Sequence, residues 1–150
     1  MTQKNHDTKS KFKAPQQQSD IFNRGLLQKR RDQAAMHFEK HDFLNREITL
    51  RLLDNLQDIK RDFNTILNMN GHPEPISQHF KDKIIFQQDL SLSMLKASPF
   101  TKIHADEEFL PFQDHSLELV FSALNLHWVN DLPGALIQIF KSLKPDGLFI

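Results

Sequence analysis

The spacing of hydrophobic residues changes near residue 62 of this chain. Before that point, apolar residues recur at the three- and four-residue intervals of amphipathic helices. After it, short apolar runs of strand length alternate with helical segments. Such alternation is typical of a parallel sheet with crossover helices, so the pattern predicts an α/β fold preceded by helices.

Three segments are expected from this change. We predict a disordered tail at 1–19, which is rich in Lys, Gln, Ser and Thr, a helical segment at 20–61 and a partial α/β domain at 62–150. Asp20 is the expected N-cap of the first helix, whose face carries Leu26, Leu27, Arg30, Ala34 and Phe38. The stripe of a second helix consists of Ile48, Leu52, Leu53, Leu56 and Ile59.

Five strands are predicted in the α/β part. They lie near Thr65–Met69, Lys83–Phe86, Thr101–His104, Glu118–Ser122 and Leu148–Ile150. Helical segments are expected near Pro75–Phe80, Ser91–Lys96 and Asp131–Leu143. In the last helix, Pro133 suits the first turn, and the run Lys144-Pro145-Asp146-Gly147 is expected to end it. Right-handed crossovers place the loops that follow the strands along one edge, where open α/β sheets bind ligands.

Composition narrows the class of protein. The 19 basic and 19 acidic residues cancel, which gives no sign of a nucleic-acid-binding surface. Cysteine is absent, which excludes disulfides and thiolate chemistry and permits a reducing compartment. No apolar run is long enough to span a bilayer, so we expect no membrane span and a cytoplasmic location.

Two acidic positions follow predicted strands. Asp89 comes just after the second strand, where a carboxylate can accept hydrogen bonds from ribose hydroxyls; the alternative is an N-cap for the next helix. Asp106 follows the third strand beside Glu107 and Glu108, and could accept from an adenine amino group or simply be solvated.

Histidines offer two further candidates. His37 and His41 share one helix face next to Asp42, but no third ligand is placed by the sequence, so a structural or surface role is expected and no metal. His127 and Trp128 follow the fourth strand, where they could line a substrate pocket or serve as packing. The basic run 29–31 could contact an acidic partner or form a solvated helix face.

Several motifs resemble those of class I S-adenosylmethionine-dependent methyltransferases. The stretches are DLSLSML from Asp89, ADEEFLPFQD from Ala105, SLELV from Ser116 and LKPDG from Leu143. A narrower resemblance, to one branch of this family, is carried by the stretches IFNR, RRDQAA, HDFL and LHWVNDLPG. That branch contains complex I assembly factors with arginine hydroxylase activity and the malonyl-carrier-protein methyltransferases of biotin synthesis.

The resemblance implies a Rossmann-like sheet that binds S-adenosylmethionine. It implies Asp89 on the ribose and Asp106 with Glu107 near the adenine, with Asn68 and Gly71 as what remains of the glycine-rich contact loop after strand one. The family's acidic residue aligns with Asn68, and its glycines align with Asn70, His72 and Glu74. His72 and Pro73 are expected to add bulk and rigidity where a ligand should lie, and Glu74 to repel the methionine carboxylate.

Class I methyltransferase sheets have seven strands, and this chain supplies about five. The chain is therefore expected to be an N-terminal fragment of a truncated, degenerate methyltransferase-like protein, with apolar surface and an unpaired edge at strands four and five. A protein partner could cover that edge. The alternatives are a non-catalytic binding or assembly-factor-like protein, or a gene fragment without function. The resemblance also admits a location in the mitochondrial matrix for a eukaryotic chain.

Overall fold

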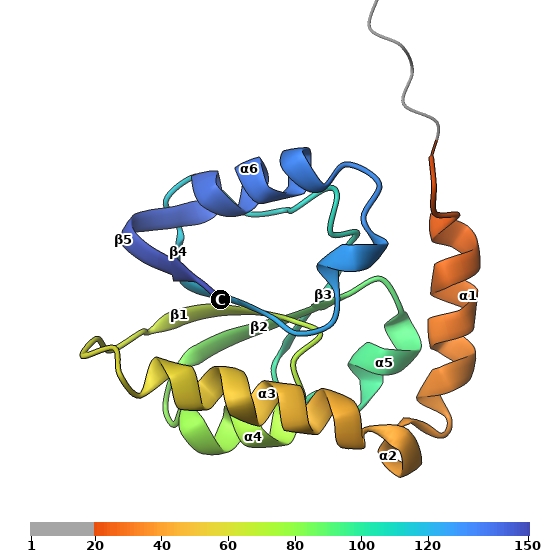
Figure 1. Cartoon of the computed structure of the whole chain (residues 1–150), viewed down its shortest axis with the longest axis horizontal. Helices are drawn as coiled ribbons and strands as arrows, with labels where there is room; N and C mark the ends of the chain where they lie inside the picture. Colours follow the sequence, from red (N-terminus) through yellow and green to blue (C-terminus); the bar gives the residue numbers. More distant parts are fainter. Residues whose placement is uncertain (1–19) are drawn as a thin grey trace, which may run out of the picture.

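The computed structural model describes residues 20–150, so the predicted tail at 1–19 lies outside the described residues. Five parallel strands form one sheet in the order β3-β2-β1-β4-β5. Helices lie on both faces of the sheet, and α1 stands at one end of it beside α5 (Figure 1). The predicted α/β class with an incomplete Rossmann-like sheet is thus confirmed.

The helices before the sheet begin at different residues than the pattern predicts. They are α1 (Arg24–Ala35), α2 (Phe38–His41) and α3 (Phe43–Leu56). Asp20 was the wrong N-cap: the side chain of Asn23 accepts from Leu26 N and starts α1. The first predicted helix is also divided, because the chain turns between α1 and α2.

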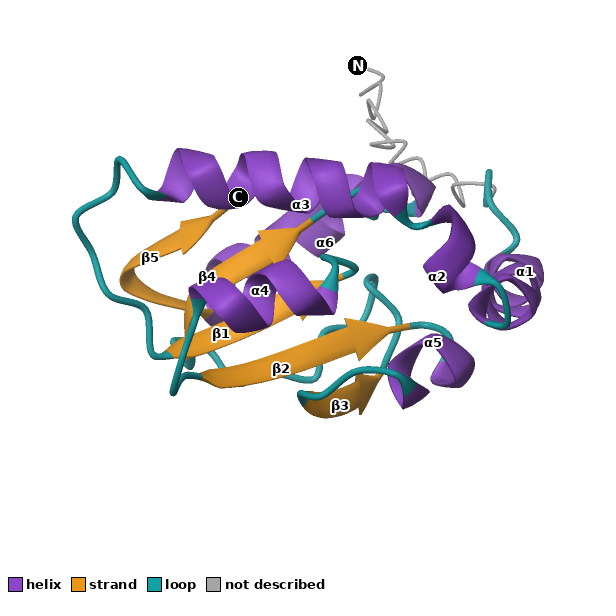
Figure 2. Cartoon of the chain, turned by 90° about the horizontal axis from the view of Figure 1, so that it is seen from below, coloured by secondary structure: helices purple, strands orange, loops and turns teal. Residues whose placement is uncertain are grey.

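The strands of the sheet are β1 (Thr65–Met69), β2 (Ile84–Asp89), β3 (Thr101–His104), β4 (Leu117–Ser122) and β5 (Leu143–Phe149). The helices between them are α4 (Pro73–His79), α5 (Leu92–Lys96) and α6 (Leu132–Ser142), with a 3-10 turn at Leu126–Trp128. β1 and β3 match the prediction residue for residue. The strand arrows run toward the side of the molecule where α1, α2 and α5 lie (Figure 2).

The end of the last helix differs from the prediction. Residues 144–147 were expected to end the helix, with the fifth strand near Leu148–Ile150, but these residues belong to β5, which begins directly after α6 at Leu143. The pairing of β5 with β4 shifts register between Leu117 and Leu119. An edge strand can hold Pro145 and a bulge because only one of its sides is hydrogen-bonded.

Two hydrophobic clusters fill the two faces of the sheet. The cluster toward α3 and α4 contains Leu53, Ile66, Ile76, Leu119 and Phe121, and the cluster toward α6 contains Leu67, Met69, Val120 and Ile139. Because β1 and β4 contribute to both clusters, the centre of the sheet is apolar on each face, as in other covered parallel sheets.

Exposed apolar surface was predicted at strands four and five, and the structure shows it at the fifth strand and the helix before it but not at the fourth. β4 pairs with β1 and β5, and its Leu117, Leu119, Val120 and Phe121 are fully buried, so the prediction of an exposed fourth strand was wrong. The exposed large apolar residues of this region lie on α6 and at the end of β5: Leu132, Leu136, Ile137, Phe140 and Phe149.

None of the helices within residues 20–150 has the length and the apolar content needed to cross a membrane.

Substitution of Phe121 tests the packing at the centre of the core. Phe121→Ala should lower the free energy of unfolding by about 3–5 kcal/mol, because it empties a fully buried aromatic site. Phe140→Ala is the matched control, since that side chain is 77% exposed and its loss should change stability by less than about 0.5 kcal/mol. Urea denaturation of both variants measures this, and equal effects would contradict the described core.

Candidate functional site

The turn after β1 is closed by the side chain of Asn68. This buried amide accepts from Gly71 N at 2.9 Å and donates to Gly71 O at 2.9 Å. It also donates to the Gln87 side chain at 2.5 Å, which links the turn to β2. A carboxylate could accept in these contacts but could not donate, so the amide is suited to both sides of the turn.

Gly71 lies where no side chain fits. A Cβ atom there would be 2.5 Å from Asn68 Oδ1, 2.7 Å from Ile76 Cδ1 and 2.7 Å from Phe121 Cε1. The preceding Asn70 adopts a φ of 67°, a left-handed conformation that asparagine tolerates better than most residues. Its carbonyl accepts from Asn45 Nδ2 at 2.7 Å, and its side chain donates to Ala123 O at 3.0 Å. The turn therefore keeps a tight shape with a single glycine.

The bulky residues of this loop are held by the preceding helices. His72 is the N-cap of α4, and its Nε2 lies 2.8 Å from Asp42 Oδ2. Its ring stacks on Phe38 with centroids 6.4 Å apart. Glu74 forms an ion pair with Arg46. These contacts direct both side chains toward α2 and α3.

Asp89 ends β2 at the carboxyl edge of the sheet, and 4% of the residue is exposed. It is not the cap of the next helix: Ser91 is the N-cap of α5, and its hydroxyl accepts from Met94 N at 3.1 Å. Asp89 Oδ1 instead accepts from Ser91 N at 2.7 Å. The carboxylate is thus fixed in the loop that follows β2.

Asp89 has a partner that the sequence did not suggest. Arg31 of α1 donates from Nε to Asp89 Oδ1 at 3.0 Å and from a terminal nitrogen to Asp89 Oδ2 at 2.5 Å. The same terminal nitrogen donates to Asn70 Oδ1 at 2.5 Å. The basic run 29–31 therefore contains one arginine that contacts the candidate site, while Lys29 and Arg30 are exposed.

Asp106 and Glu107 meet a second arginine of α1. Arg24 donates to both oxygens of Asp106, at 3.0 and 2.6 Å, and also pairs with Glu107. Burial by itself lowers the pKa of Arg24, but the hydrogen bonds and charges of Asp106 and Glu107 raise that pKa above its usual value. Glu107 is buried and Asp106 is partly buried, so this cluster is a charged, largely enclosed part of the edge.

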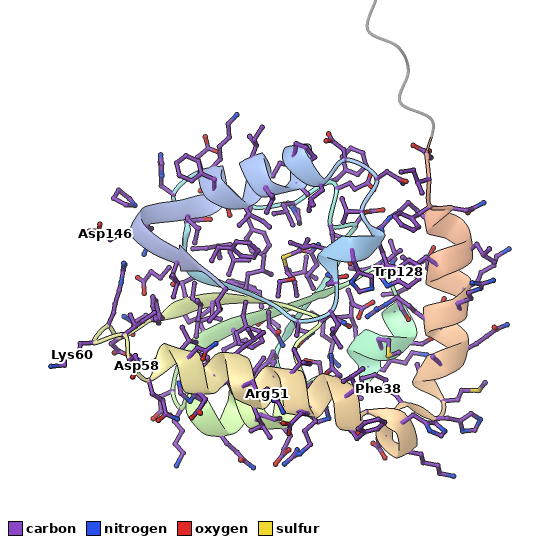
Figure 3. All side chains as sticks on the ribbon, viewed as in Figure 1. Phe38, Arg51, Asp58, Lys60, Trp128 and Asp146 are labelled. Atoms are coloured by element: carbon purple, nitrogen blue, oxygen red, sulfur yellow. The ribbon has the colours of Figure 1, made fainter. Side chains whose placement is uncertain are left out.

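His127 and Trp128 lie in the turn after β4, and both are exposed. The Trp128 ring meets Phe22 edge to face at 5.4 Å, and its carbonyl accepts from Arg24 at 2.9 Å. Figure 3 shows Trp128 beside α1. In this arrangement the indole anchors the start of α1.

A cavity of about 510 Å³ opens beside the turn after β1. Its size falls within the range of small-molecule sites. Gly71 and Asp89 line it, whereas Asn68, Asp106, Glu107, His127 and Trp128 do not. Most of the rest of its wall comes from α2, α3, α4 and the α5 region, including Phe38, Asp42, Asn45, His72, Met94 and Pro99.

No group of three or more potential metal ligands occurs among residues 20–150. Asp42, the acidic neighbour of the predicted His37 and His41 pair, contacts His72.

The carboxyl edge of the sheet carries acidic groups that can accept hydrogen bonds from a polar ligand. Asp89 ends β2, and Asp106 lies in the loop after the neighbouring parallel strand β3. Gly71 lines the cavity at the end of β1. Asp89 and Asp106 are both engaged by arginines of α1, so a ligand would have to share or replace these contacts.

The chain was compared with known proteins. Residues 71–150 match the family model described as a methyltransferase domain. The mouse (Mus musculus) protein named arginine-hydroxylase NDUFAF5, mitochondrial, is 45% identical over 141 residues, which cover 87% of this chain and 41% of the relative. Malonyl-[acyl-carrier protein] O-methyltransferase 1 of Coxiella burnetii is 26% identical, covering 78% of this chain and 43% of the relative. The chain thus spans about two fifths of the length of these curated relatives.

Solved structures share the fold. A Haloferax volcanii protein described as a methyltransferase, in complex with the Trm112 methyltransferase activator, superposes with a TM-score of 0.70 at 19% identity, covering 81% of this chain and 57% of that chain. A SAM-dependent methyltransferase of Thermotoga maritima superposes with a TM-score of 0.62 at 16% identity, covering 79% and 57%.

Gly71 gives a direct test of the turn. Gly71→Ala should destabilise the protein by about 1–3 kcal/mol, since the added methyl group meets atoms on three sides. Gly25→Ala is the control: a Cβ there lies 3.5 Å from the nearest atom, and alanine favours the helix. Thermal and urea unfolding should show the loss in the first variant alone. A neutral Gly71→Ala would contradict the described packing.

Proposed function

The chain belongs to the methyltransferase-domain family, and on this premise we propose that it is a methyltransferase-like domain that binds S-adenosylmethionine at the carboxyl edge of its sheet. Asp89 accepts from the ribose hydroxyls, Asp106 lies near the adenine with Glu107 beside it, and the turn at Gly71 lies beside the ligand. When bound, S-adenosylmethionine supplies an electrophilic methyl group on sulfur. This chain's own residues bind and orient the nucleoside.

One observation carries the proposal. β2 and β3 are parallel neighbours in register, with Asp89 paired to His104, so the loop that holds Asp106 begins directly beside Asp89. Carboxylates on adjacent loops at this edge can address the ribose and the base of one nucleoside. The tight turn at Gly71 lies at the end of the next strand, β1.

The departures at the first loop are proposed to weaken binding. Asn68 replaces the family's acidic residue and uses its amide to close the turn. His72 and Glu74 replace glycines but contact Asp42 and Arg46. They limit the space beside the turn, so the loop supports a lower affinity than a glycine-rich loop would. This is the sense in which we propose a degenerate member of the family.

One relative is named as an arginine hydroxylase and another as a malonyl-carrier methyltransferase, so the same family spans different chemistry. Because the chain spans about two fifths of those proteins, nucleoside binding is the part of their function that we assign to it. A mitochondrial location, as in the name of the mouse relative, and a cytoplasmic one both stay predictions.

Calorimetric titration with S-adenosylmethionine and S-adenosylhomocysteine tests the proposal. We expect a dissociation constant between about 10 µM and 1 mM, which corresponds to about 4–7 kcal/mol of binding free energy. Asp89→Asn should weaken binding by about 1.5–3 kcal/mol if Asp89 accepts from the ribose, because a charged acceptor is lost.

Asp58→Asn is the control for this substitution. Asp58 is exposed and lies at the end of the molecule away from α1 (Figure 3). It should bind like the unaltered chain. Absence of binding by the folded chain and its Arg31→Ala variant at about 1 mM ligand would contradict the proposed function.

A second candidate function is that of a non-catalytic binding or assembly protein. It is favoured by the apolar residues of α6 that face solvent, Leu136, Ile137 and Phe140, next to β5, whose outer edge has no partner strand within residues 20–150. A polypeptide with an apolar face and a strand that extends β5 would cover both features.

Sedimentation tests this second candidate through self-association. The isolated chain should associate as concentration rises, and Phe140→Asp should reduce that association by placing a charge in the exposed patch. Phe43→Asp on α3 is the control, since that residue is 76% exposed on a different helix. If the chain stays a cooperatively folded monomer at all concentrations, the exposed apolar face of α6 is not a binding surface for another copy of the chain.

A further inference from the structure

Helix α1 contacts the sheet through a polar stripe. Arg24, Gln28, Arg31 and Asp32 share one helical face, since they are spaced by three, four, seven and eight residues. No residue of α1 is buried, so apolar packing is not what holds this helix. Its contacts are instead directed at the loops that follow β2 and β3.

The stripe follows the carboxyl edge of the sheet. Gln28 lies 3.4 Å from His104 at the end of β3, and Asp32 accepts from the Ser91 hydroxyl at 2.5 Å. The Ser91 hydrogen bond lowers the pKa of Asp32, so this carboxylate stays charged near neutral pH. On the same face of α1, Arg31 pairs with Asp89 and Arg24 pairs with Asp106, the two candidate nucleoside acceptors.

We propose that α1 is a displaceable strap: it closes the edge by placing Arg31 on Asp89 and Arg24 on Asp106, and an adenine nucleoside binds by displacing it. This inference rests on the proposed function, because it takes Asp89 and Asp106 as the nucleoside's acceptors. The arginines of α1 therefore compete with the nucleoside for Asp89 and Asp106.

The competition follows from the acceptor capacity of Asp89. Oδ1 already accepts from Ser91 N and Arg31 Nε, and Oδ2 accepts from the terminal nitrogen of Arg31. A guanidinium that donates to both carboxylate oxygens competes with ribose hydroxyls for the same acceptors. The side chain of Asp89 is only 5% exposed, so it offers a ligand little surface while Arg31 stays in place.

The strap also has a fixed end. Phe22 N donates to Asn130 Oδ1 at 2.7 Å, and Asn130 Nδ2 donates to Phe22 O at 3.0 Å. With the Phe22 and Trp128 ring contact, this clamp holds the start of the helix near the turn after β4. A helix anchored at its start and held elsewhere by polar contacts belongs to the part of a structure that opens at low free energy.

Hydrogen exchange of the unaltered chain tests the strap with S-adenosylhomocysteine as the probe. Amides of α1 should exchange about fivefold or more faster when the ligand saturates the protein, while amides of β1 and β4 should not. In titrations, Arg31→Ala should bind S-adenosylhomocysteine about fivefold or more tightly than the unaltered chain, because the competing guanidinium is gone. Arg30→Ala, an exposed arginine of the same helix, should bind like the unaltered chain.

Other outcomes would overturn the strap in distinguishable ways. If the unaltered chain binds and α1 becomes more protected, or if Arg31→Ala binds more weakly although folded, Arg31 is a ligand contact and α1 is no competitor. If neither the unaltered chain nor Arg31→Ala binds, the proposed function fails and the strap fails with it. The exchange measurement decides the question even if Arg31→Ala folds poorly.

Discussion

The buried amide of Asn68 is the interaction on which the candidate site depends. It bonds to both the N–H and the carbonyl of Gly71 and so closes the turn at the end of the central strand. The turn brings Gly71 against Phe121 of β4, where there is no room for a side chain. Since β1 lies between β2 and β4, the shape of this turn fixes the middle of the carboxyl edge.

Charge at that edge is balanced within the chain. Asp89, Asp106 and Glu107 are too enclosed to remain unpaired without a large free-energy cost, and α1 supplies Arg31 and Arg24 to them. The same pairing that neutralises the acids also covers them. In the proposed function, nucleoside binding and docking of α1 involve the same carboxylates, so the N-terminal helix becomes part of the proposed site.

Much of the fold could be predicted from the sequence, because short apolar runs identify strands well. β1 and β3 match, and the order of the elements follows from their alternation. The start of β5 could not be predicted in this way, since Pro145 and Gly147 are typical of turns and only the bulged edge position accommodates them. Asp20 was expected to cap the first helix, but the cap is Asn23. Both side chains can accept from a helix N-terminus, so residue type alone does not identify the cap.

The site was predicted only in part. Asp89 and Asp106 could be named because they follow strands, but their partners Arg31 and Arg24 lie 58 and 82 residues away in the chain, and no local pattern joins them. The contacts that hold His72 to Asp42 and Glu74 to Arg46 are also long-range. The sequence could therefore show that these side chains are bulky, but not which way they point.

The central claim is that a nucleoside binds at the carboxyl edge beside Gly71 and Asp89. Amide chemical-shift mapping during titration with S-adenosylhomocysteine tests it most directly. The account predicts the largest shifts at Gly71, at Ser91, whose N–H donates to Asp89, and along α1. Saturating shifts confined to other parts of the chain, or none at all in the folded protein, would contradict it.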